Sequence, residues 1–187
     1  MALPAARATN AHDASLTVMA DPELMALAER LQGICLGRGL TVAVAESCTG
    51  GLVASTLTEV AGASGYFRGG IVSYSDGSKT RLLAVEPATI TAHGSVSAQA
   101  ARAMAIGARV QFAASLAASV TGIAGPDGGT PEKPVGLTYV GLATLPSTSV
   151  RRFAWQGDRA ANRHQSTRAV IEWLIEAAEE MAAEVPR

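Results

Sequence analysis

Three polar side chains in this sequence have the types and spacing of a covalent catalytic group. Ser47 follows the apolar residues 42–45 and Glu46, Tyr74 ends a second apolar run, and Lys79 comes five residues after Tyr74. No Ser-His-Asp arrangement is evident, so the pattern favours a serine nucleophile activated by a lysine. The lysine must then be neutral, and burial or a neighbouring cation achieves this by lowering its pKa. The structural alternatives are a helix cap at Ser47 and a solvated helix residue at Lys79.

The segment ESCTGG, residues 46–51, predicts a turn from a buried strand into a helix. Apolar residues 40–45 suit a strand that is covered on both faces, and residues 50–54 are typical of the first turn of a helix. Ser47 would then lie at the carboxyl end of the strand. Backbone N–H groups from Cys48 onward would point at a developing negative charge on the substrate.

A loop rich in glycine and proline follows another predicted strand, residues 116–121. It covers residues 122–131, and its part from Gly125 to Gly129 exposes backbone N–H groups that could hold a phosphate or a carboxamide. Lys133, Arg159 and Arg163 are the available counter-charges. The alternative is a flexible surface loop without a binding role.

The remaining pattern predicts strands that alternate with helices. Asp21 and Pro22 begin a helix that ends at Gly37 or Gly39. Further helices are expected over residues 50–60, 75–83, 97–112 and 159–183, further strands over residues 70–74, 135–143 and 149–155, and a plain connection over residues 87–94. This order indicates an α/β fold with three layers, α/β/α, around a mixed, mostly parallel sheet of about five strands.

The predicted fold brings distant polar residues together. Parallel strands expose their carboxyl ends at one edge of a sheet, where ligands bind. Ser47, Tyr74 and Thr121 each end a predicted parallel strand. We therefore expect all three at one edge.

Length and composition favour a single compact domain. The 187 residues are 48% hydrophobic and 17% charged, with a formal net charge of −1. This balance gives no electrostatic footprint for nucleic acid or an anionic membrane. Residues 1–20 read as a flexible N-terminal extension and residues 21–187 as the domain. No apolar run is long enough to span a membrane, and two cysteines without metal-ligand spacing fit a reducing, cytoplasmic setting.

Metal and nucleotide cofactors are not expected. His12, His93 and His164 lack the spacing of a metal site, and neither a GxxxxGK loop nor a GxGxxG turn occurs in the sequence. Tyr74 and Lys79 are five residues apart, whereas a dehydrogenase pair has a spacing of four. The chemistry would therefore need no metal ion and no cofactor.

Several long motifs together resemble the CinA C-terminal domain family, whose stand-alone members are known as nicotinamide mononucleotide deamidases. They are AESCTGG, GGIVSYSDGSK, GSVS, SVTGIAGPDGGTPEKPVG and QGDR, and the resemblance covers residues 24–174. It implies an amidohydrolase of pyridine nucleotide salvage that converts nicotinamide mononucleotide to nicotinic acid mononucleotide and ammonia. It also implies self-association, with a dimer favoured.

The resemblance assigns roles to individual residues. Ser47 would attack the carboxamide carbon while Lys79, through or beside Tyr74, takes its proton. Glu46 could orient Lys79 or Thr49 or bind ribose hydroxyls, and these options stay open. The residues expected to bind substrate are Glu46, Thr49, Gly50, Gly51, Thr121, Gly122, Gly125 and Arg159.

Two other functions fit parts of the pattern. A non-catalytic module that binds a nucleotide or a partner protein could keep the same fold, although the intact set of Ser47, Tyr74 and Lys79 argues against lost activity. A Ser-Lys peptidase or lactam-binding hydrolase would need an SxxK motif, but Gly50 stands three residues after Ser47. Ammonia release from nicotinamide mononucleotide distinguishes the first alternative from the enzyme.

Overall fold

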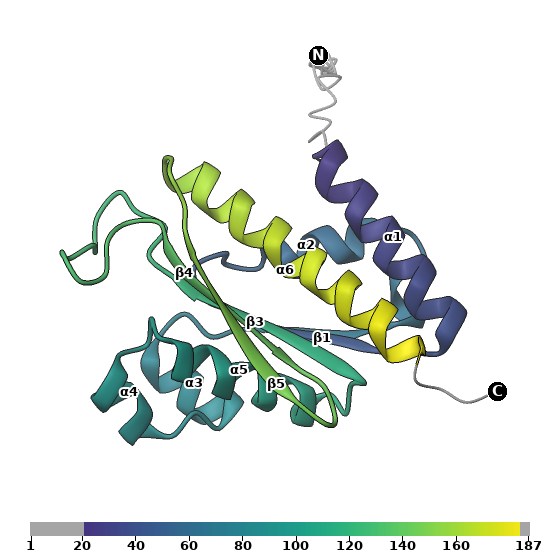
Figure 1. Ribbon diagram of the computed structural model, residues 1–187, viewed down its shortest axis with the longest axis horizontal. Coiled ribbons are helices and arrows are strands. Elements are labelled where there is room, and N and C mark those ends of the chain that lie inside the picture. The colour runs from purple at the N-terminus through teal and green to yellow at the C-terminus, as the bar shows by residue number, and fades with distance from the viewer. Residues whose placement is uncertain (1–20, 184–187) are drawn as a thin grey trace, which may run out of the picture.

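The computed structural model describes residues 21–183, so the predicted extension over residues 1–20 lies outside the described part. Figure 1 shows three layers, with α1, α2 and α6 on one face of the sheet and α3, α4 and α5 on the other. The elements are α1 (Pro22–Arg38), β1 (Val42–Glu46), α2 (Leu52–Glu59), the 3-10 turn η1 (Ala63–Gly65), β2 (Phe67–Val72), α3 (Asp76–Leu83), α4 (Pro87–His93), α5 (Ala98–Gln111), β3 (Leu116–Gly122), β4 (Leu137–Ala143), β5 (Thr148–Ala154) and α6 (Arg159–Ala183).

The sheet confirms the predicted fold class. Its five described strands have the order β2-β1-β3-β4-β5. β1 pairs in parallel with both β2 and β3, whereas β4 is antiparallel to β3 and to β5. Four strands therefore run in one direction and β4 runs in the other.

The core lies on both faces of the central strands, because β1 and β3 are mostly apolar and almost wholly buried. Val42 and Val44 face the layer of α1, α2 and α6, while Ala43 and Ala45 face α3 and α5. Side chains alternate between the faces of a strand, so each face of β1 is covered by a different helical layer. This burial fixes the position of Ser47, which follows β1 directly.

Helix α1 begins and ends as its sequence predicts. The Asp21 carboxylate accepts hydrogen bonds from the amides of Glu23 and Leu24, and Pro22 occupies the first turn. Gly39 ends the helix in the left-handed conformation, with φ of 65°.

Several predicted boundaries were wrong by two residues or more, among them the starts of β1 and β4, which lie at Val42 and Leu137 rather than at residues 40 and 135. Residues 87–94 are not a plain connection: Pro87–His93 form α4, which has no buried residue and so lacks the apolar periodicity that identifies a helix in sequence. β2 covers Phe67–Val72 rather than residues 70–74, because a strand at the edge of the sheet tolerates the Gly69–Gly70 pair. Helix α2 begins at Leu52, two residues later than expected.

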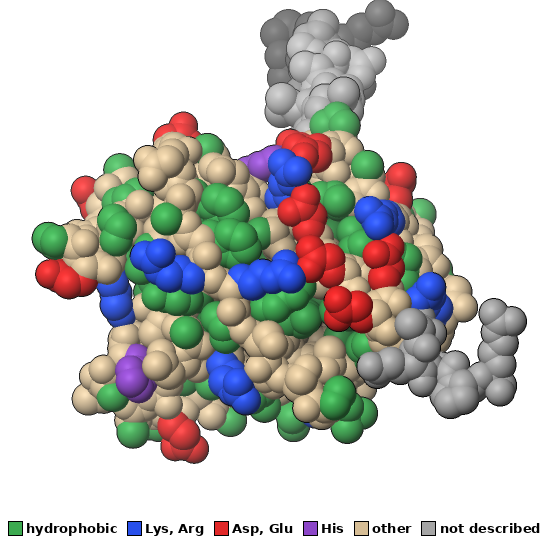
Figure 2. Space-filling model, in the orientation of Figure 1, with side chains coloured by type: hydrophobic (Ala, Val, Ile, Leu, Met, Phe, Trp, Pro, Cys, Tyr) green, Lys and Arg blue, Asp and Glu red, His purple; other side chains and the backbone are tan. Residues whose placement is uncertain are grey.

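Acidic and basic side chains lie intermixed over α1 and the adjoining part of α6 (Figure 2). Ion pairs link Arg30 to Glu179 and Arg168 to Glu23 across the two helices. Among the described helices, none combines the length and the hydrophobicity that crossing a bilayer requires.

Candidate active site

A pocket of about 250 Å³ opens at the carboxyl edge of the parallel strands. Ser47 after β1, Tyr74 after β2 and Thr121 in β3 all line it, as the strand order predicts. The complete lining consists of Ser47, Cys48, Tyr74, Lys79, Ser95, Val96, Thr121, Gly122, Ile123, Ala124, Gly125, Asp127, Gly128 and Arg159. Seven of the eleven predicted site residues therefore share one cavity.

Lys79 reaches Ser47 from the first turn of α3. Its Nζ lies 3.3 Å from Ser47 Oγ and donates a 3.0 Å hydrogen bond to the Ser73 carbonyl. Ser75 caps α3 by a reciprocal hydrogen-bond pair with Ser78, which fixes where the helix starts and thus where Lys79 lies. The structural alternative for Lys79, a solvated helix residue, is wrong because only 2% of the residue is exposed.

Burial changes the acidity of the lysine. Desolvation lowers the pKa of Lys79 below its ordinary value, and the charge of Asp76 opposes that shift. A lower pKa increases the fraction of neutral amine at a given pH. The neutral amine has the free electron pair that a base needs to take a proton from Ser47.

Cys48, which adjoins Ser47, is not poised as a competing nucleophile. Burial raises the pKa of its thiol to about 12, and the charge of Glu46 adds to that shift. The thiol therefore stays protonated, and a protonated thiol is a poor nucleophile. Ser47 remains the nucleophile candidate of this turn.

Glu46 organises the turn from behind the pocket. Its carboxylate is 1% exposed. It accepts hydrogen bonds from the Thr49 hydroxyl at 2.7 Å and from the amides of Gly51, Val53 and Ala54 at 2.9, 3.1 and 2.8 Å. The first amides of α2 thus bind an acidic side chain of the protein itself.

The turn residues themselves lie outside the pocket lining. Glu46, Thr49, Gly50 and Gly51 were predicted to bind substrate, but none of them lines the cavity around Ser47. Gly50 and Gly51 have positive φ angles of 63° and 96°, which only glycine adopts without strain. Their place in the structure is the sharp bend that carries the chain from Ser47 into α2.

Arg159 lies between two walls of the pocket. One guanidinium nitrogen donates to the Tyr74 hydroxyl and the other to the Gly125 carbonyl, both at 2.9 Å. The other two predicted counter-charges lie elsewhere. Arg163 donates twice to the Thr49 carbonyl, and Lys133 donates to the carbonyls of His93 and Val96.

The loop of residues 122–131 forms the wall next to Arg159. At Gly125 φ is +89°, and an added Cβ would lie 2.6 Å from Val135 Cγ1. At Gly122 an added Cβ would lie 2.6 Å from Thr138 Oγ1. Thr121 donates its hydroxyl to the Ser95 carbonyl at 2.8 Å and so joins this wall to the next loop.

Seven of the pocket residues were not predicted as site residues: Cys48, Ser95, Val96, Ile123, Ala124, Asp127 and Gly128. Ser95 and Val96 belong to the GSVS motif, and Asp127 belongs to the glycine-rich loop, so each stood within a segment already marked as unusual. Ser95 and Val96 were not predicted because their loop follows a helix, whereas the predicted site residues were sought at the ends of parallel strands. The charge of Asp127 could have marked it as a site residue, but the glycine-rich loop was expected to bind ligands through its backbone N–H groups.

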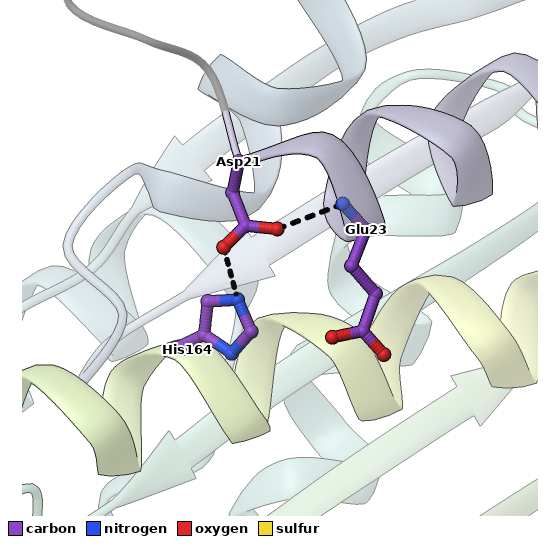
Figure 3. A group of neighbouring side chains, drawn as sticks. All are labelled: Asp21, Glu23 and His164. Atoms are coloured by element: carbon purple, nitrogen blue, oxygen red, sulfur yellow. Dashed lines mark hydrogen bonds and ion pairs between the residues drawn. The ribbon is translucent and has the colours of Figure 1, made fainter.

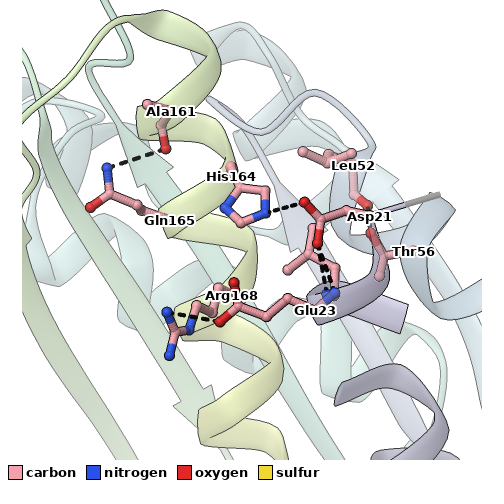
Figure 4. A network of polar contacts seen from close by, with 9 residues as sticks. Asp21, Glu23, Leu52, Thr56, Ala161, His164, Gln165 and Arg168 are labelled. Carbon is pink, nitrogen blue, oxygen red and sulfur yellow. Dashed lines mark hydrogen bonds and ion pairs between the residues drawn. The ribbon is translucent and has the colours of Figure 1, made fainter. Parts of the chain in front are cut away.

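A second polar cluster joins α1 to α6 (Figure 3). Potential ligand atoms of Asp21, Glu23 and His164 all lie within 4.8 Å of one another. His164 Nε2 lies 2.8 Å from Asp21 Oδ2. The Glu23 carboxylate pairs with Arg168 at 2.9 Å, and Figure 4 shows these contacts as one network. Each of the three groups already has a partner within the protein, so the cluster acts as a clamp between two helices.

The fold and the pocket define an α/β protein with a Ser-Lys pair at the carboxyl edge of a mixed sheet. Residues 24–178 match the family model described as the CinA C-terminal domain. The chain belongs to this family.

The chain is similar both to much longer proteins and to a protein that it covers almost completely. A CinA-like protein of Citrifermentans bemidjiense is 53% identical over 146 residues, which is 78% of this chain and 35% of the relative. The chain therefore spans about a third of such relatives. The nicotinamide-nucleotide amidohydrolase PncC of Escherichia coli K12 is 44% identical over 157 residues, which is 83% of this chain and 95% of that protein.

Solved structures share the fold. The competence/damage inducible protein CihA of Agrobacterium tumefaciens superposes with a TM-score of 0.82 at 38% identity, covering 85% of this chain and 97% of the other. A CinA superfamily protein of Klebsiella pneumoniae gives a TM-score of 0.81 at 29% identity, covering 84% and 98%.

Proposed function

We propose that this protein hydrolyses the carboxamide of nicotinamide mononucleotide to nicotinic acid mononucleotide and ammonia. The observation that carries the proposal is the buried Lys79 amine, 3.3 Å from the Ser47 hydroxyl at the floor of an open pocket. The similarity to a protein named nicotinamide-nucleotide amidohydrolase supports the choice of substrate. The reaction would place the chain in pyridine nucleotide salvage in the cytoplasm.

Acylation begins when Ser47 Oγ attacks the carboxamide carbon and neutral Lys79 takes the hydroxyl proton. The resulting oxyanion would be held by the amide of Cys48, which lines the pocket, because the amides of Gly51, Val53 and Ala54 already bind Glu46. The protonated lysine then gives its proton to the leaving nitrogen. Ammonia departs and an ester to Ser47 remains.

Deacylation repeats these steps with water as the nucleophile. Lys79 takes a proton from water, the hydroxide attacks the ester carbon, and the proton returns to Ser47 Oγ as the acid leaves. In this scheme Tyr74 orients Arg159 through their 2.9 Å hydrogen bond. Its role as a proton relay stays a prediction.

The substrate's phosphate is the group that Arg159 would bind, because Arg159 is the predicted counter-charge that lines the pocket. The amides of the loop at Gly122 and Gly125 and the Thr121 hydroxyl would contact the rest of the nucleotide. Glu46, Thr49, Gly50 and Gly51 would act on the substrate indirectly, by holding the turn that presents Ser47.

Ammonia release tests the proposal directly. We expect the wild-type protein to release ammonia from nicotinamide mononucleotide and to act far more slowly on nicotinamide riboside and nicotinamide, which lack the phosphate. Ser47→Ala should lower the rate by a factor of about 10³ or more, because the covalent path is lost. Circular dichroism should show the variant folded.

Two outcomes would contradict it. Full activity in Ser47→Ala would mean that another group is the nucleophile. A folded wild-type protein that releases no ammonia from any of the three compounds would support the alternative, a binding module without catalysis.

The family resemblance also leads us to propose a homodimer. Three large apolar side chains, Leu82, Ile106 and Val110, are exposed on α3 and α5 around a groove of about 320 Å³. Light scattering coupled to size exclusion should give twice the monomer mass. A monomer at all micromolar concentrations would contradict this expectation.

A further inference from the structure

Asp127 is a charged pocket residue that the proposed reaction does not use. It lies on the glycine-rich loop, its side chain is exposed, and it lines the same cavity as Ser47 and Arg159. Among the described residues its carboxylate forms no ion pair, although Arg159 lines the same cavity. An uncompensated negative charge therefore faces the substrate space.

The other charges of the pocket are already engaged. Lys79 is buried against Ser73 and Ser47, and Arg159 bridges Tyr74 and Gly125. Ser-Lys chemistry needs a base and oxyanion donors but no carboxylate. A carboxylate would even repel the phosphate and the acid product, so its presence calls for a positive group on the ligand.

The loop also holds Asp127 in place. The carbonyls of Ala124 and Gly125, just before it, accept hydrogen bonds from Asn162 and Arg159 of α6. Lys133, six residues after it, donates hydrogen bonds of 2.7 and 2.8 Å to the carbonyls of His93 and Val96, at the end of α4 and just beyond it. A charge anchored on both sides can select a ligand by position as well as by sign.

We propose that Asp127 recognises the positive charge of an oxidised pyridinium ring and so makes the pocket selective against the reduced, uncharged dihydropyridine form. This inference rests on the proposed function. The pyridinium nitrogen is two bonds from the ring carbon that carries the carboxamide, so a carboxamide placed at Ser47 brings the ring charge into the same pocket. Arg159 and Asp127 then match the two opposite charges of a pyridinium nucleotide.

Binding to a variant that does not turn over separates recognition from chemistry. Calorimetry would measure the Kd of nicotinamide mononucleotide and of its dihydro form for Ser47→Ala and for Ser47→Ala with Asp127→Asn. We expect Asp127→Asn to raise the Kd of the oxidised ligand about three- to fivefold, as for loss of a solvent-exposed charge pair. The Kd of the reduced ligand should not change. The effect of Asp127→Asn on the Kd of the oxidised ligand should be smaller at high salt, because salt screens the charge pair.

The matched control is Glu132→Gln in the same background. Glu132 is an exposed acid that directly follows the same loop and does not line the pocket. Its replacement by Gln changes the net charge by the same amount as Asp127→Asn. It should leave both affinities unchanged. An equal effect of Glu132→Gln and Asp127→Asn would overturn the inference, because a general charge effect would then suffice.

Other outcomes also decide the matter. Equal weakening of both ligands by Asp127→Asn would mean that Asp127 binds a group common to both, such as the ribose hydroxyls, and the inference would fall. No change for either ligand would overturn it as well. In both cases ammonia release by the wild type would leave the proposed function standing, whereas absence of any nucleotide binding and of ammonia release would overturn both.

Discussion

Burial of the charged Lys79 side chain is unfavourable in free energy, yet this residue lies almost wholly inside the protein. An amine without water loses solvation of its charged form, and in this protein one carbonyl and one hydroxyl replace that water. The arrangement destabilises the ammonium relative to the amine. The charge of Asp76 works in the opposite direction. In the proposed mechanism the balance between burial and charge therefore sets the pH at which Lys79 activates Ser47.

Asp76 gives a direct test of that balance. Its negative charge favours the ammonium and raises the pKa of Lys79. Removing the charge in Asp76→Asn should lower this pKa further, so more neutral amine exists at a given pH. The rising limb of kcat/KM against pH should therefore move to lower pH, as measured by ammonia release across the pH range.

Glu59→Gln provides the comparison for Asp76→Asn. Glu59 is an exposed acid at the end of α2 and is not among the groups that shift Lys79. Its pH profile should match the wild type. A limb that stays in place in Asp76→Asn, or that moves to higher pH, would exclude Lys79 as the group that titrates in the rate.

Helix α6 is the element that ties the pocket together. Within its first two turns, Arg159, Asn162 and Arg163 donate to the carbonyls of Gly125, Ala124 and Thr49 respectively. These acceptors belong to the glycine-rich loop and to the Ser47 turn, which are far apart in sequence. One helix thus sets the distance between Ser47 and the loop that we propose to bind the nucleotide.

Helices α3 and α5 set the other critical distance. Gly107 on α5 lies against the end of α3, where an added Cβ would lie 2.1 Å from the Leu83 carbonyl oxygen. Gly107→Ala should push α3, and with it Lys79, away from Ser47. We expect a loss of about 1–3 kcal/mol in the free energy of unfolding and a drop in kcat of about tenfold or more, from denaturant titration and ammonia release.

The same substitution in α1 should have the opposite effect on stability. Gly33 is exposed in the middle of α1, and an added Cβ would meet no atom within 4 Å. Gly33→Ala should stabilise the protein by about 0.5–1 kcal/mol with unchanged kcat. If Gly107→Ala behaves like Gly33→Ala, the contact between α3 and α5 does not position the lysine.

The sequence could predict elements whose local pattern agrees with their surroundings. The strands β1 and β3, the caps of α1 and the meeting of Ser47, Tyr74 and Thr121 follow from apolar runs, turn residues and the geometry of parallel strands. Helix α4 was missed because none of its residues is fully buried and only Ile90 packs against the core, so its residues carry no clear apolar period.

Side-chain partners were the harder part of the site. Glu46 belongs to the strongest motif, yet only the folded structure shows that α2 turns its amides back onto this carboxylate. The choice between Lys133, Arg159 and Arg163 depended on where α6 and the loop pack, which involves contacts across many residues of sequence. Such contacts produce no periodic pattern in the sequence.

At the scale of the whole molecule, the clamp of Asp21 and His164 joins the first described helix to the last (Figures 3 and 4). The pKa of Asp21 is lowered, first by the hydrogen bond from the Leu24 amide and then by His164. A lowered pKa means that this contribution to stability is present at neutral pH and is lost as the pH falls through that pKa.

Two variants separate the parts of the clamp. Asp21→Ala should lower the melting temperature at neutral pH, because both the helix cap and the His164 contact disappear. Asp21→Asn keeps a good cap and should lie between Asp21→Ala and the wild type. Thermal denaturation measures the order, and equal melting temperatures for all three proteins would show that the clamp adds nothing to stability.

The dependence of the pocket on α6 has a consequence during protein synthesis. Residues 159–163 leave the ribosome after Ser47, Tyr74, Lys79 and the glycine-rich loop, so the nascent chain holds every reacting group before it holds the helix that fastens their loops. If the proposed mechanism holds, catalytic activity should thus arise only when this last helix docks, and incomplete chains would carry Ser47 without an assembled pocket.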